Sequence, residues 1–457
     1  MGVHRIRKGL DLPLAGEPEQ VVHPGPAVSR VALLGADYPG LKPSLRVQVG
    51  EPVVRGQLLF EDARIPGVRF TAPGAGTVAG IHRGERRLLQ SVVIQLDPEE
   101  RPGGEAPQAR FASFAGKLPE RLSEGEIRAL LLESGLWTAF RTRPFSRVPS
   151  PANPPHSIFV TAIDTQPHAP SVEVVLAGRQ EDFAVGLRAV EALTPGPVFL
   201  CRAPGARIEP APGGRAAVEE FRGPHPAGTP GVHIHLLDPV HLDKTVWHIG
   251  VQDVAAIGRL LATGKLDCER VVSFAGPSVR RPRLLRTLLG ASLDELTQGE
   301  LEPGDHRVIS GSVLTGRTAR GNVEGYLGRY HQQVAALAEG REREFLGWLA
   351  PGRNKFSITN AFASAFARRR RFALTTSTQG STRPMVPIGT YEEVMPMDIE
   401  ATYLLRALLT DDMERAEALG CLELDEEDLS LCTFVSETKH DFGPMLREML
   451  NRIQKES

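Results

Sequence analysis

The residue types best suited to contacting a ligand are concentrated in one short segment, Ser134 to Arg147. Its aromatic and cationic residues are Trp137, Phe140, Arg141, Arg143, Phe145 and Arg147. An aromatic face can stack on a flat ring, and a guanidinium can donate hydrogen bonds to oxygens at the edge of that ring. The segment therefore suits a flat, partly polar ligand or a protein partner. It equally suits a hydrophobic plug with solvated arginines, and residue types alone do not separate the two.

The flanking sequence predicts where this segment lies in the fold. Ser123 and Glu126 form a capping box that begins a helix, and the apolar run 157–163 predicts a strand. The segment thus connects a helix to a strand at the edge of an α/β layer. Nucleotide-binding folds place glycines at such connections, because backbone N–H groups must approach phosphates closely. Gly135 stands alone here, so a loop this bulky is not expected to wrap a pyrophosphate.

A second segment, Gly311 to Thr318, is one residue away from a P-loop. Arg317 stands where a P-loop has its lysine, and a planar guanidinium is a poor replacement for that compact point charge. Gly321 then interrupts the helix that should follow. The segment therefore predicts an ordinary β-turn instead of a nucleotide triphosphatase site.

Five histidines lie close together in the sequence. They are His225, His233, His235, His241 and His248. His233 and His235 are two apart on a predicted strand, 231–237, so both would face one side, as zinc ligands can. The other three lie near predicted turns and supply no evident further ligand spacing. We expect hydrogen-bonding histidines that line a groove, with a metal site as the alternative.

The C-terminal cysteines are spaced like the end of an iron–sulfur motif. Cys432 and Ser436 have C-x-x-x-C spacing, but serine occupies the second ligand position, and Cys421 is the nearest other cysteine. Two thiolates cannot hold a four-iron cluster. We therefore expect two isolated buried thiols, and we find no Ser/His/Asp elbow, HExxH helix or GxGxxG turn elsewhere in the chain.

Composition excludes several classes of function. The 457 residues carry a formal net charge of −2, which gives no reason to expect a nucleic-acid track or a polybasic membrane patch. No window approaches the roughly 18 apolar residues of a membrane span. Four cysteines in a chain of this length do not form a disulfide framework, and no signal peptide is evident. A cytoplasmic protein without a transmembrane segment is expected.

The pattern of elements predicts a multi-domain α/β protein. An extended arm, expected to lie along a neighbouring subunit, is followed by short strands at 31–34, 45–49, 57–60, 77–81 and 91–96. Later strands alternate with helices such as 181–193 and 253–263. Two amphipathic helical stretches, 322–348 and 397–453, end the chain. The predicted divisions are 1–30 (arm), 31–97 (first module), 98–283 (layered α/β), 284–321 (small mixed segment) and 322–457 (helical).

The first module resembles the barrel-sandwich fold of biotinyl and lipoyl carrier domains. The phrases that carry the resemblance are VQVGEPVVRGQLLFED and FTAPGAGTVAGI. Such carriers present a modifiable lysine at a hairpin tip, and the equivalent stretch here, Asp62 to Pro66, has none. The resemblance therefore implies the scaffold without the swinging-arm chemistry.

Longer strings resemble one family over almost the whole chain. They include KGLDLPLAGEPEQ (8–20), RVALLGADYPGLKPS (30–44), ESGLWTAFRTRPFS (133–146), GVHIHLLDPV (231–240), HRVISGSVLTGR (306–317) and YEEVMPMD (391–398). These strings are similar to the A subunit of the Na+-translocating NADH:quinone oxidoreductase, a bacterial respiratory sodium pump. That family is related to the electron-input subunit of the Rnf complexes and to the flavoprotein subunit of complex I. The resemblance implies a degenerate flavoprotein-like α/β domain and a small β-grasp-like segment at 284–321.

The resemblance also implies a function. It implies a peripheral subunit on the cytoplasmic face of the bacterial inner membrane, docked on integral membrane subunits of a six-subunit complex that couples ubiquinone reduction to Na+ export. This chain is then expected to hold no cofactor, because FAD, FMN, riboflavin and [2Fe-2S] belong to other subunits. Quinone contact is expected in two stretches, 34–41 and 140–147. The candidate residues are Leu34, Tyr38, Leu41, Trp137, Phe140, Arg141, Arg143 and Phe145. The alternative is a stand-alone nucleotide- or flavin-binding protein on the same scaffold.

Overall fold

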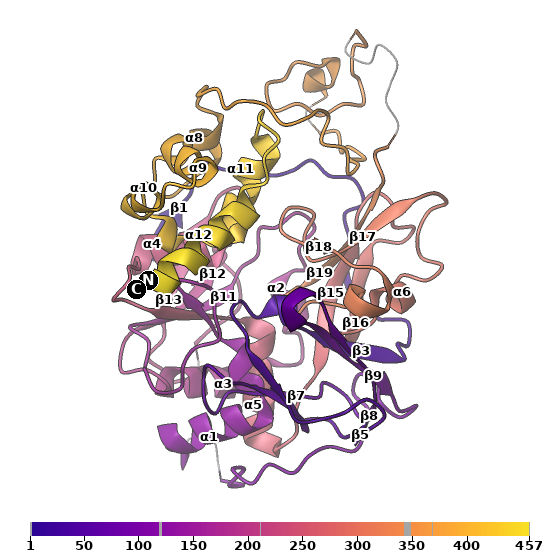
Figure 1. The fold of residues 1–457 in the computed structure, drawn as a ribbon, viewed down its shortest axis with the longest axis vertical. Helices are drawn as coiled ribbons and strands as arrows, with labels where there is room; N and C mark the ends of the chain where they lie inside the picture. Colours follow the sequence, from indigo (N-terminus) through magenta and orange to yellow (C-terminus); the bar gives the residue numbers. More distant parts are fainter. Residues whose placement is uncertain (1, 118–120, 211, 342–348, 368, 457) are drawn as a thin grey trace.

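The computed structural model describes residues 2–117, 121–210, 212–341, 349–367 and 369–456. The described strands form two sheets of six strands, one of four and one of three. The longer helices lie against the first six-stranded sheet or gather in a C-terminal group (Figure 1).

The first sheet has the order β1-β13-β12-β11-β14-β10, and only β10 is antiparallel to its neighbour. The strands are β1 (Gly2–Arg5), β10 (Arg141–Arg143), β11 (Ile158–Ala162), β12 (Val198–Arg202), β13 (Ala217–Arg222) and β14 (Val246–Gly250). The helices that flank it are α1 (Glu124–Ser134), α3 (Gln180–Ala192), α4 (Pro230–Leu237) and α5 (Val251–Thr263), with the short α2 (Val172–Val175) nearby.

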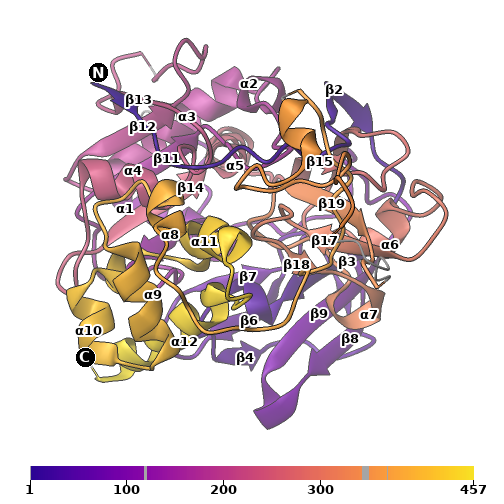
Figure 2. The same cartoon turned by 90° about the horizontal axis from the view of Figure 1, so that it is seen from above.

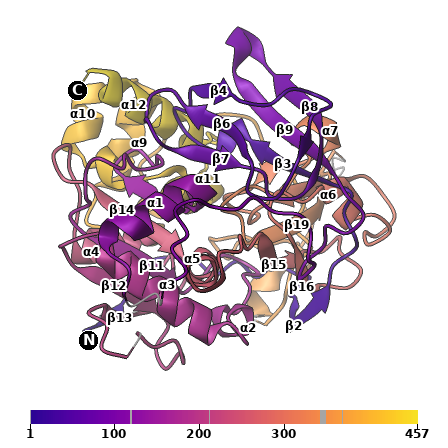
Figure 3. The same cartoon turned by 90° about the horizontal axis from the view of Figure 1, so that it is seen from below.

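Helices cover both faces of this sheet (Figures 1 and 3). Ile158 and Val160 of β11 share a core cluster with residues of α3 and α5, whereas Phe159 packs in another cluster with Ile234 of α4. Burial on both faces explains the continuous apolar run of β11. The predicted α/β layer with a partly parallel sheet is therefore confirmed, as are its capping box at Ser123 and the helices near 181–193 and 253–263.

The predicted strand at 231–237 is wrong, because these residues form the helix α4. Pro230 occupies the first turn, where the missing N–H costs nothing, and Thr229 precedes it with extended backbone. His233 and His235 therefore do not share one face of a strand. The apolar and histidine-rich sequence resembled a buried strand, but eight residues of it fit equally well as a buried helix.

The first module predicted from the sequence, 31–97, combines the four-stranded sheet β3-β9-β8-β5 with the three-stranded sheet β4-β6-β7. Its strands are β3 (Arg30–Leu34), β4 (Pro43–Leu45), β5 (Pro52–Val53), β6 (Leu58–Asp62), β7 (Arg69–Thr71), β8 (Gly76–Arg83) and β9 (Leu89–Leu96). Four predicted strands are confirmed, whereas 45–49 is strand only at Leu45, and the short β5 and β7 went unpredicted. The predicted tip, Asp62 to Pro66, joins β6 to a turn before β7.

The second six-stranded sheet has the order β18-β17-β19-β15-β16-β2. Its strands are β2 (Glu19–Pro24), β15 (Glu269–Ala275), β16 (Arg283–Leu288), β17 (His306–Ser310), β18 (Arg317–Thr318) and β19 (Gln333–Ala338), with α6 (Leu293–Leu296) and α7 (Gly321–Glu324) beside it. The sheet therefore extends across the predicted domain boundaries at 283 and 321. Strand β15 lies before the first boundary, and strand β19 lies after the second.

The predicted helix at 322–348 is wrong over its described part. Residues Gln333–Ala338 form β19, which pairs with β15 on one side and β17 on the other, and 342–348 lie outside the described residues. QVAALA has good helix propensity, but pairing on both sides in a sheet overrides it.

The N-terminal arm is extended, as predicted. However, β1 pairs with β13 and β2 pairs with β16. These two stretches therefore complete the edges of sheets of their own chain, and the expectation that the arm lies along a neighbouring subunit stays a prediction.

The predicted helices at 397–453 are confirmed as a C-terminal group. Its helices are α8 (Thr390–Val394), α9 (Ala401–Leu409), α10 (Met413–Ala418), α11 (Ser430–Val435) and α12 (Phe442–Glu456). The apolar face of α12 (Leu446, Met449, Leu450 and Ile453) is buried in the core of this group. The group lies beside the first sheet (Figures 2 and 3), and Arg447 of α12 donates to the carbonyl of Phe145, which follows β10.

Candidate functional site

The segment Ser134 to Arg147 is shaped by its backbone. Gly135 ends α1 in the left-handed region with φ 81°, and a 3-10 turn, Leu136–Ala139, leads into β10. After β10, Phe145 and Ser146 also have positive φ, and the Thr142 N–H donates to the Arg147 carbonyl at 2.8 Å. The segment therefore folds back on itself at the edge of the sheet.

Trp137 and Phe140 lie in the protein core. Both are 0% exposed and pack with Trp247 of β14, with ring centroids 5.3 to 5.7 Å apart. The Trp137 indole N–H donates to the Pro149 carbonyl at 2.9 Å. The predicted role of Phe140 as an open face for a flat ring is therefore contradicted, because no face of its ring reaches solvent. The plug interpretation holds for these two aromatics.

Arg143 is fully buried among carboxylates of the C-terminal group. Its Nη1 lies 2.8 Å from Asp428 Oδ2, and its Nη2 lies 2.9 Å from Glu427 Oε1. Arg141 bonds Asp425 Oδ2 at 2.5 Å. The predicted donation of Arg143 to a ligand is therefore contradicted, since its Nη donors are occupied and no solvent path reaches them.

The carboxylates of this network respond to burial and to the arginines in different ways. Although burial opposes it, the charges of Arg143 and Arg141 hold the pKa of Asp425 well below its usual range. Burial and the neighbouring Asp428 raise the pKa of Glu427 to about 7. The network therefore joins the loop after β10 to the acidic stretch 425–428 as a buried ionic interface.

The two stretches predicted to contact quinone meet at Gly40 and Arg147. A Cβ on Gly40, which has φ +76°, would lie 2.0 Å from Arg147 Nη1, so the guanidinium rests directly on this glycine. Arg64 Nη1 donates to the Gly40 carbonyl at 3.2 Å, and Arg447 Nη1 donates to the Phe145 carbonyl at 2.8 Å. We call this set the Gly40–Arg147 junction.

Arg147 differs from the other two cations of the junction, because Arg447 is paired with carboxylates and Arg64 donates to the Gly40 carbonyl. Its guanidinium makes no hydrogen bond or ion pair with any described residue, and its Nε is buried without an acceptor. Burial, together with the charges of Arg64 and Arg447, lowers the pKa of Arg147. An acceptor oxygen placed here would gain a charged donor that the protein leaves unused.

Tyr330 connects the same region to the second sheet. Its hydroxyl donates to the Thr138 carbonyl at 2.8 Å, the Arg141 guanidinium lies 4.9 Å from its ring centroid, and Tyr38 packs edge-on at 6.1 Å. Arg329 pairs with buried Asp253 at 2.9 Å. Sequence reasoning missed these residues, because Tyr330 lay in a stretch predicted as helix and nothing in its spacing pointed to β10.

The other predicted residues lie close to this region but differ in access. Leu34 and Tyr38 are buried at 2% and 4% exposure, whereas Leu41 is half-buried. Phe145 is half-buried against the C-terminal helices. A cavity of about 30 Å³ beside Tyr38 holds roughly one water and no ring. Among the predicted residues, Leu41, Arg141 and Phe145 keep accessible surface.

Comparison with known proteins identifies the family. Family models described as the NqrA N-terminal barrel-sandwich hybrid domain, the NqrA second alpha/beta domain and the NQRA C-terminal domain match residues 4–97, 122–266 and 271–321. The A subunit of the Na(+)-translocating NADH-quinone reductase of Shewanella amazonensis is 54% identical over 451 residues, covering 99% of each chain. The proteins of the same name from Serratia proteamaculans and Cellvibrio japonicus are 53% and 52% identical over 452 residues, again covering 99% of each chain. The chain belongs to this family.

Solved structures with weaker likeness are chains of an NAD+-reducing [NiFe]-hydrogenase. In the air-oxidized state, the match has 14% identity and a TM-score of 0.38, and it covers 75% of this chain and 65% of the other. These values are too low to carry an argument about fold or function.

In this NqrA family member, His233 and His235 make hydrogen bonds within the fold. His233 is buried, its Nε2 lies 3.0 Å from the Ala227 carbonyl, and burial lowers its pKa to about 3. His235 bridges α4 to Glu423 at 2.8 Å. Among the described residues, no group of three or more His, Cys, Asp or Glu is placed to hold a metal ion.

The remaining motifs of this NqrA chain also have structural explanations. Cys421 and Cys432 are buried free thiols, and burial raises the pKa of each to about 12. Ser436 bonds Tyr391 and Thr438 instead of a metal. Arg317 donates to the Glu324 and Tyr326 carbonyls at 2.9 Å, which agrees with the predicted turn and leaves no P-loop cradle.

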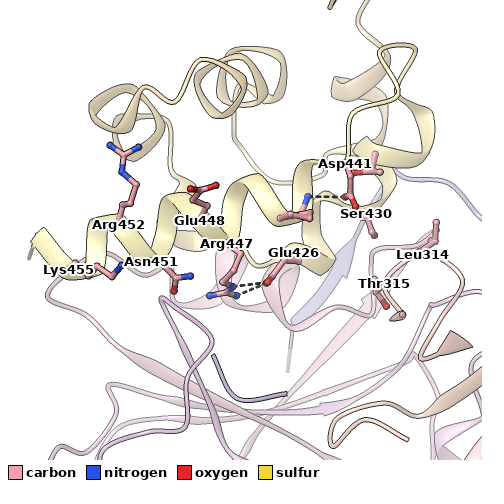
Figure 4. Close-up of a pocket in the computed structure, with 14 residues that line it drawn as sticks. Leu314, Thr315, Glu426, Ser430, Asp441, Arg447, Glu448, Asn451, Arg452 and Lys455 are labelled. Carbon is pink, nitrogen blue, oxygen red and sulfur yellow. Dashed lines mark hydrogen bonds and ion pairs between the residues drawn. The ribbon is translucent and has the colours of Figure 1, made fainter. Parts of the chain in front are cut away.

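A cavity of about 640 Å³ lies between α12 and the turn before β18 (Figure 4). Thr315 stands at one end, and Arg447, Asn451 and Lys455 line the α12 side. Arg447 is already paired with Glu426 across this wall. Most residues that line the cavity are polar or charged, and the cavity opens beside the C-terminal helices. Within the described part of the chain, no helix is both long and apolar enough to cross a membrane.

Proposed function

We propose that this chain is the peripheral NqrA component of a Na+-translocating NADH-quinone reductase, that it lies at the cytoplasmic face of the bacterial inner membrane, and that it docks on integral membrane subunits. The observation that carries this is the 54% identity, over 99% of each chain, to a relative of that name. In this role the chain supports quinone reduction coupled to Na+ export without a redox cofactor of its own.

The packing of the loop after α1 supports the cofactor-free part of the proposal. A flavin phosphate needs open backbone N–H groups, but Trp137 and Phe140 fill the space between this loop and β14. The absorbance of the purified chain separates this proposal from the stand-alone flavoprotein alternative. A flavin band near 450 nm would contradict the proposal, and a colourless sample that does not bind NADH would support it.

We place quinone contact at the Gly40–Arg147 junction. A quinone carbonyl is a hydrogen-bond acceptor, and Arg147 offers a charged donor without an ionic partner in the described chain. Leu41 and Phe145 supply accessible apolar surface from the two stretches that meet here. Since Arg143 is held by three carboxylates, Arg147 replaces it as the donor in this proposal.

Replacing Arg147 in the assembled complex tests this placement. Arg147→Gln is expected to lower kcat/KM for a short-chain ubiquinone by about 10- to 100-fold, the loss of one charge-assisted hydrogen bond. Oxidation of NADH by an artificial acceptor that bypasses quinone should not change, and Arg147→Lys should restore part of the loss. The matched control is Arg83→Gln, an exposed arginine in the β8–β9 hairpin. Unchanged quinone kinetics in Arg147→Gln would remove quinone from this junction.

A further inference from the structure

One part of the chain departs sharply from the near-neutral average. From Leu349 to Tyr391 the sequence has six arginines and one lysine but no aspartate or glutamate. A formal charge of −2 for the whole chain therefore hides a strongly basic segment. Since electrostatic attraction to a surface depends on local charge within about a Debye length, the average is the wrong guide here.

The first half of this segment folds into a small lobe. We call residues 349–367 and 369–372 the basic lobe. The Ala363 N–H donates to the Pro351 carbonyl at 2.8 Å, and the Lys355 ammonium lies 5.9 Å from the Phe362 ring centroid. Arg370 bonds Asn354. These contacts tie the two halves of the lobe together, although its described residues form no helix longer than one 3-10 turn, Ala363–Phe366.

The lobe is anchored to the molecule at Phe372. This residue is buried, its N–H donates to the Pro13 carbonyl at 2.7 Å, and its ring lies 5.7 Å from that of Phe356. Figure 1 shows the lobe in orange at one end of the long axis of the molecule, away from the β8–β9 hairpin. The lobe is therefore a fixed projection.

Apolar side chains are exposed on the same lobe. Phe366 is 94% exposed and Leu349 is 63% exposed, and Arg369, Arg370 and Arg371 follow Phe366 closely in sequence. Arg353 and Arg369 form no ion pair with a described residue, and Arg371 reaches Glu17 only at 3.4 Å on the surface. An exposed aromatic side chain beside such arginines contributes little to the stability of the fold.

We propose that the basic lobe binds the surface of an anionic lipid bilayer. Cations attract the headgroups, and Phe366 with Leu349 enters the boundary between headgroups and acyl chains. A protein partner is less well matched, because the arginines lie along a projecting loop instead of around a pocket that would read one carboxylate pattern. The inference does not depend on quinone binding at the Gly40–Arg147 junction.

Vesicle sedimentation of the purified full chain tests this proposal. The chain should sediment with vesicles of phosphatidylcholine mixed with phosphatidylglycerol, should release at high salt, and should not sediment with phosphatidylcholine alone. Each arginine removed is expected to weaken binding about fivefold, so that Arg369→Gln/Arg370→Gln/Arg371→Gln lowers it on the order of a hundredfold. Phe366→Ser should lower binding with little change in salt dependence.

The β8–β9 hairpin offers a matched control. It carries three exposed arginines, Arg83, Arg86 and Arg87, beside Leu88 at 66% exposure. Arg83→Gln/Arg86→Gln/Arg87→Gln should leave vesicle binding unchanged, and circular dichroism should show that all variants are folded. Equal binding to neutral vesicles, or equal loss in the hairpin variant, would overturn the proposal. So would a lobe variant that keeps vesicle binding but no longer co-purifies with the other subunits, since the lobe would then contact protein.

Discussion

At the scale of single residues, the arginines after α1 have three different environments within seven positions. Arg143 is 0% exposed and held by carboxylates, Arg141 bonds Asp425 while lying over Tyr330, and Arg147 has no ionic partner among the described residues. A buried charge is stable only when it is paired, so Arg143 belongs to the fold. Arg147 keeps its donors for something outside the chain.

Removal of Arg143 should destabilise the protein strongly. Arg143→Met leaves Asp428 buried without its ion-pair partner and removes one of the three arginines around Asp425, which is expected to cost about 3–5 kcal/mol in the free energy of unfolding, measured by urea denaturation. The control is Arg452→Met, which breaks a pair with Asp411 on the surface and should cost about 0–1 kcal/mol. A similar small cost for both variants would show that the buried network is not needed for stability.

At the scale of elements, the α/β layer depends on one close helix crossing. A Cβ on Gly186 of α3 would lie 1.8 Å from the Val254 carbonyl oxygen of α5, and a Cβ on Gly258 of α5 would lie 1.8 Å from the Asp182 carbonyl oxygen of α3. The two backbones therefore approach each other through paired glycines. Glycine has a low helix propensity, and the close packing of α3 against α5 offsets the cost of placing Gly186 and Gly258 within these helices.

Replacing a glycine by alanine adds one methyl group, and the effect on stability should show whether helix propensity or close packing matters more at that position. Gly186→Ala improves helix propensity but forces backbone atoms apart, so thermal or urea unfolding should show a loss of about 1–3 kcal/mol. Gly125→Ala in α1 meets nothing within 4 Å and should stabilise by up to about 1 kcal/mol. If Gly186→Ala were neutral or stabilising, the close approach of α3 and α5 would be incorrect.

At the scale of the whole molecule, burial of histidines couples folding to pH. Burial lowers the pKa of His225 to about 4 and that of His331 to about 3, as it does that of His233. The unfolded chain binds protons at these groups below pH 6.5 while the folded chain does not, so their contribution to stability is lost as pH falls from 6.5 toward 4. Glu426 and Glu427, with pKa values raised to about 7, oppose this trend over the same window.

Difference measurements should isolate the histidine contribution. Between pH 6.5 and 4, each buried histidine is expected to remove about 1.4 kcal/mol of stability per pH unit. His331→Gln should therefore reduce the pH slope of the unfolding free energy by about that amount relative to the wild type. Exposed His241→Gln serves as the control and should leave the slope unchanged. Equal slopes in all three proteins would show that His331 titrates normally in the folded state.

Local patterns predicted much of the fold. The capping box at Ser123, most strands of the first module and the alternation of strands and helices around 157–263 were predicted from the sequence. Caps, turns and short apolar runs depend on only a few neighbouring residues, so the local sequence is enough to predict them. The errors at 231–237 and 322–348 have one cause. An apolar stretch of six to eight residues satisfies either a helix or a strand, and sequence-distant partners determine which one forms.

The sequence by itself determined the family, the barrel-sandwich and α/β elements, and the two stretches that meet at Gly40 and Arg147. Only the tertiary structure decided which side chains of those stretches stay accessible. Trp247 buries Phe140 from a strand about a hundred residues away, and Asp428 pairs Arg143 across 285 positions. Burial and charge pairing depend on such long-range neighbours. Two aromatic residues, or two arginines, in similar sequence contexts can therefore be buried in one place and exposed in another.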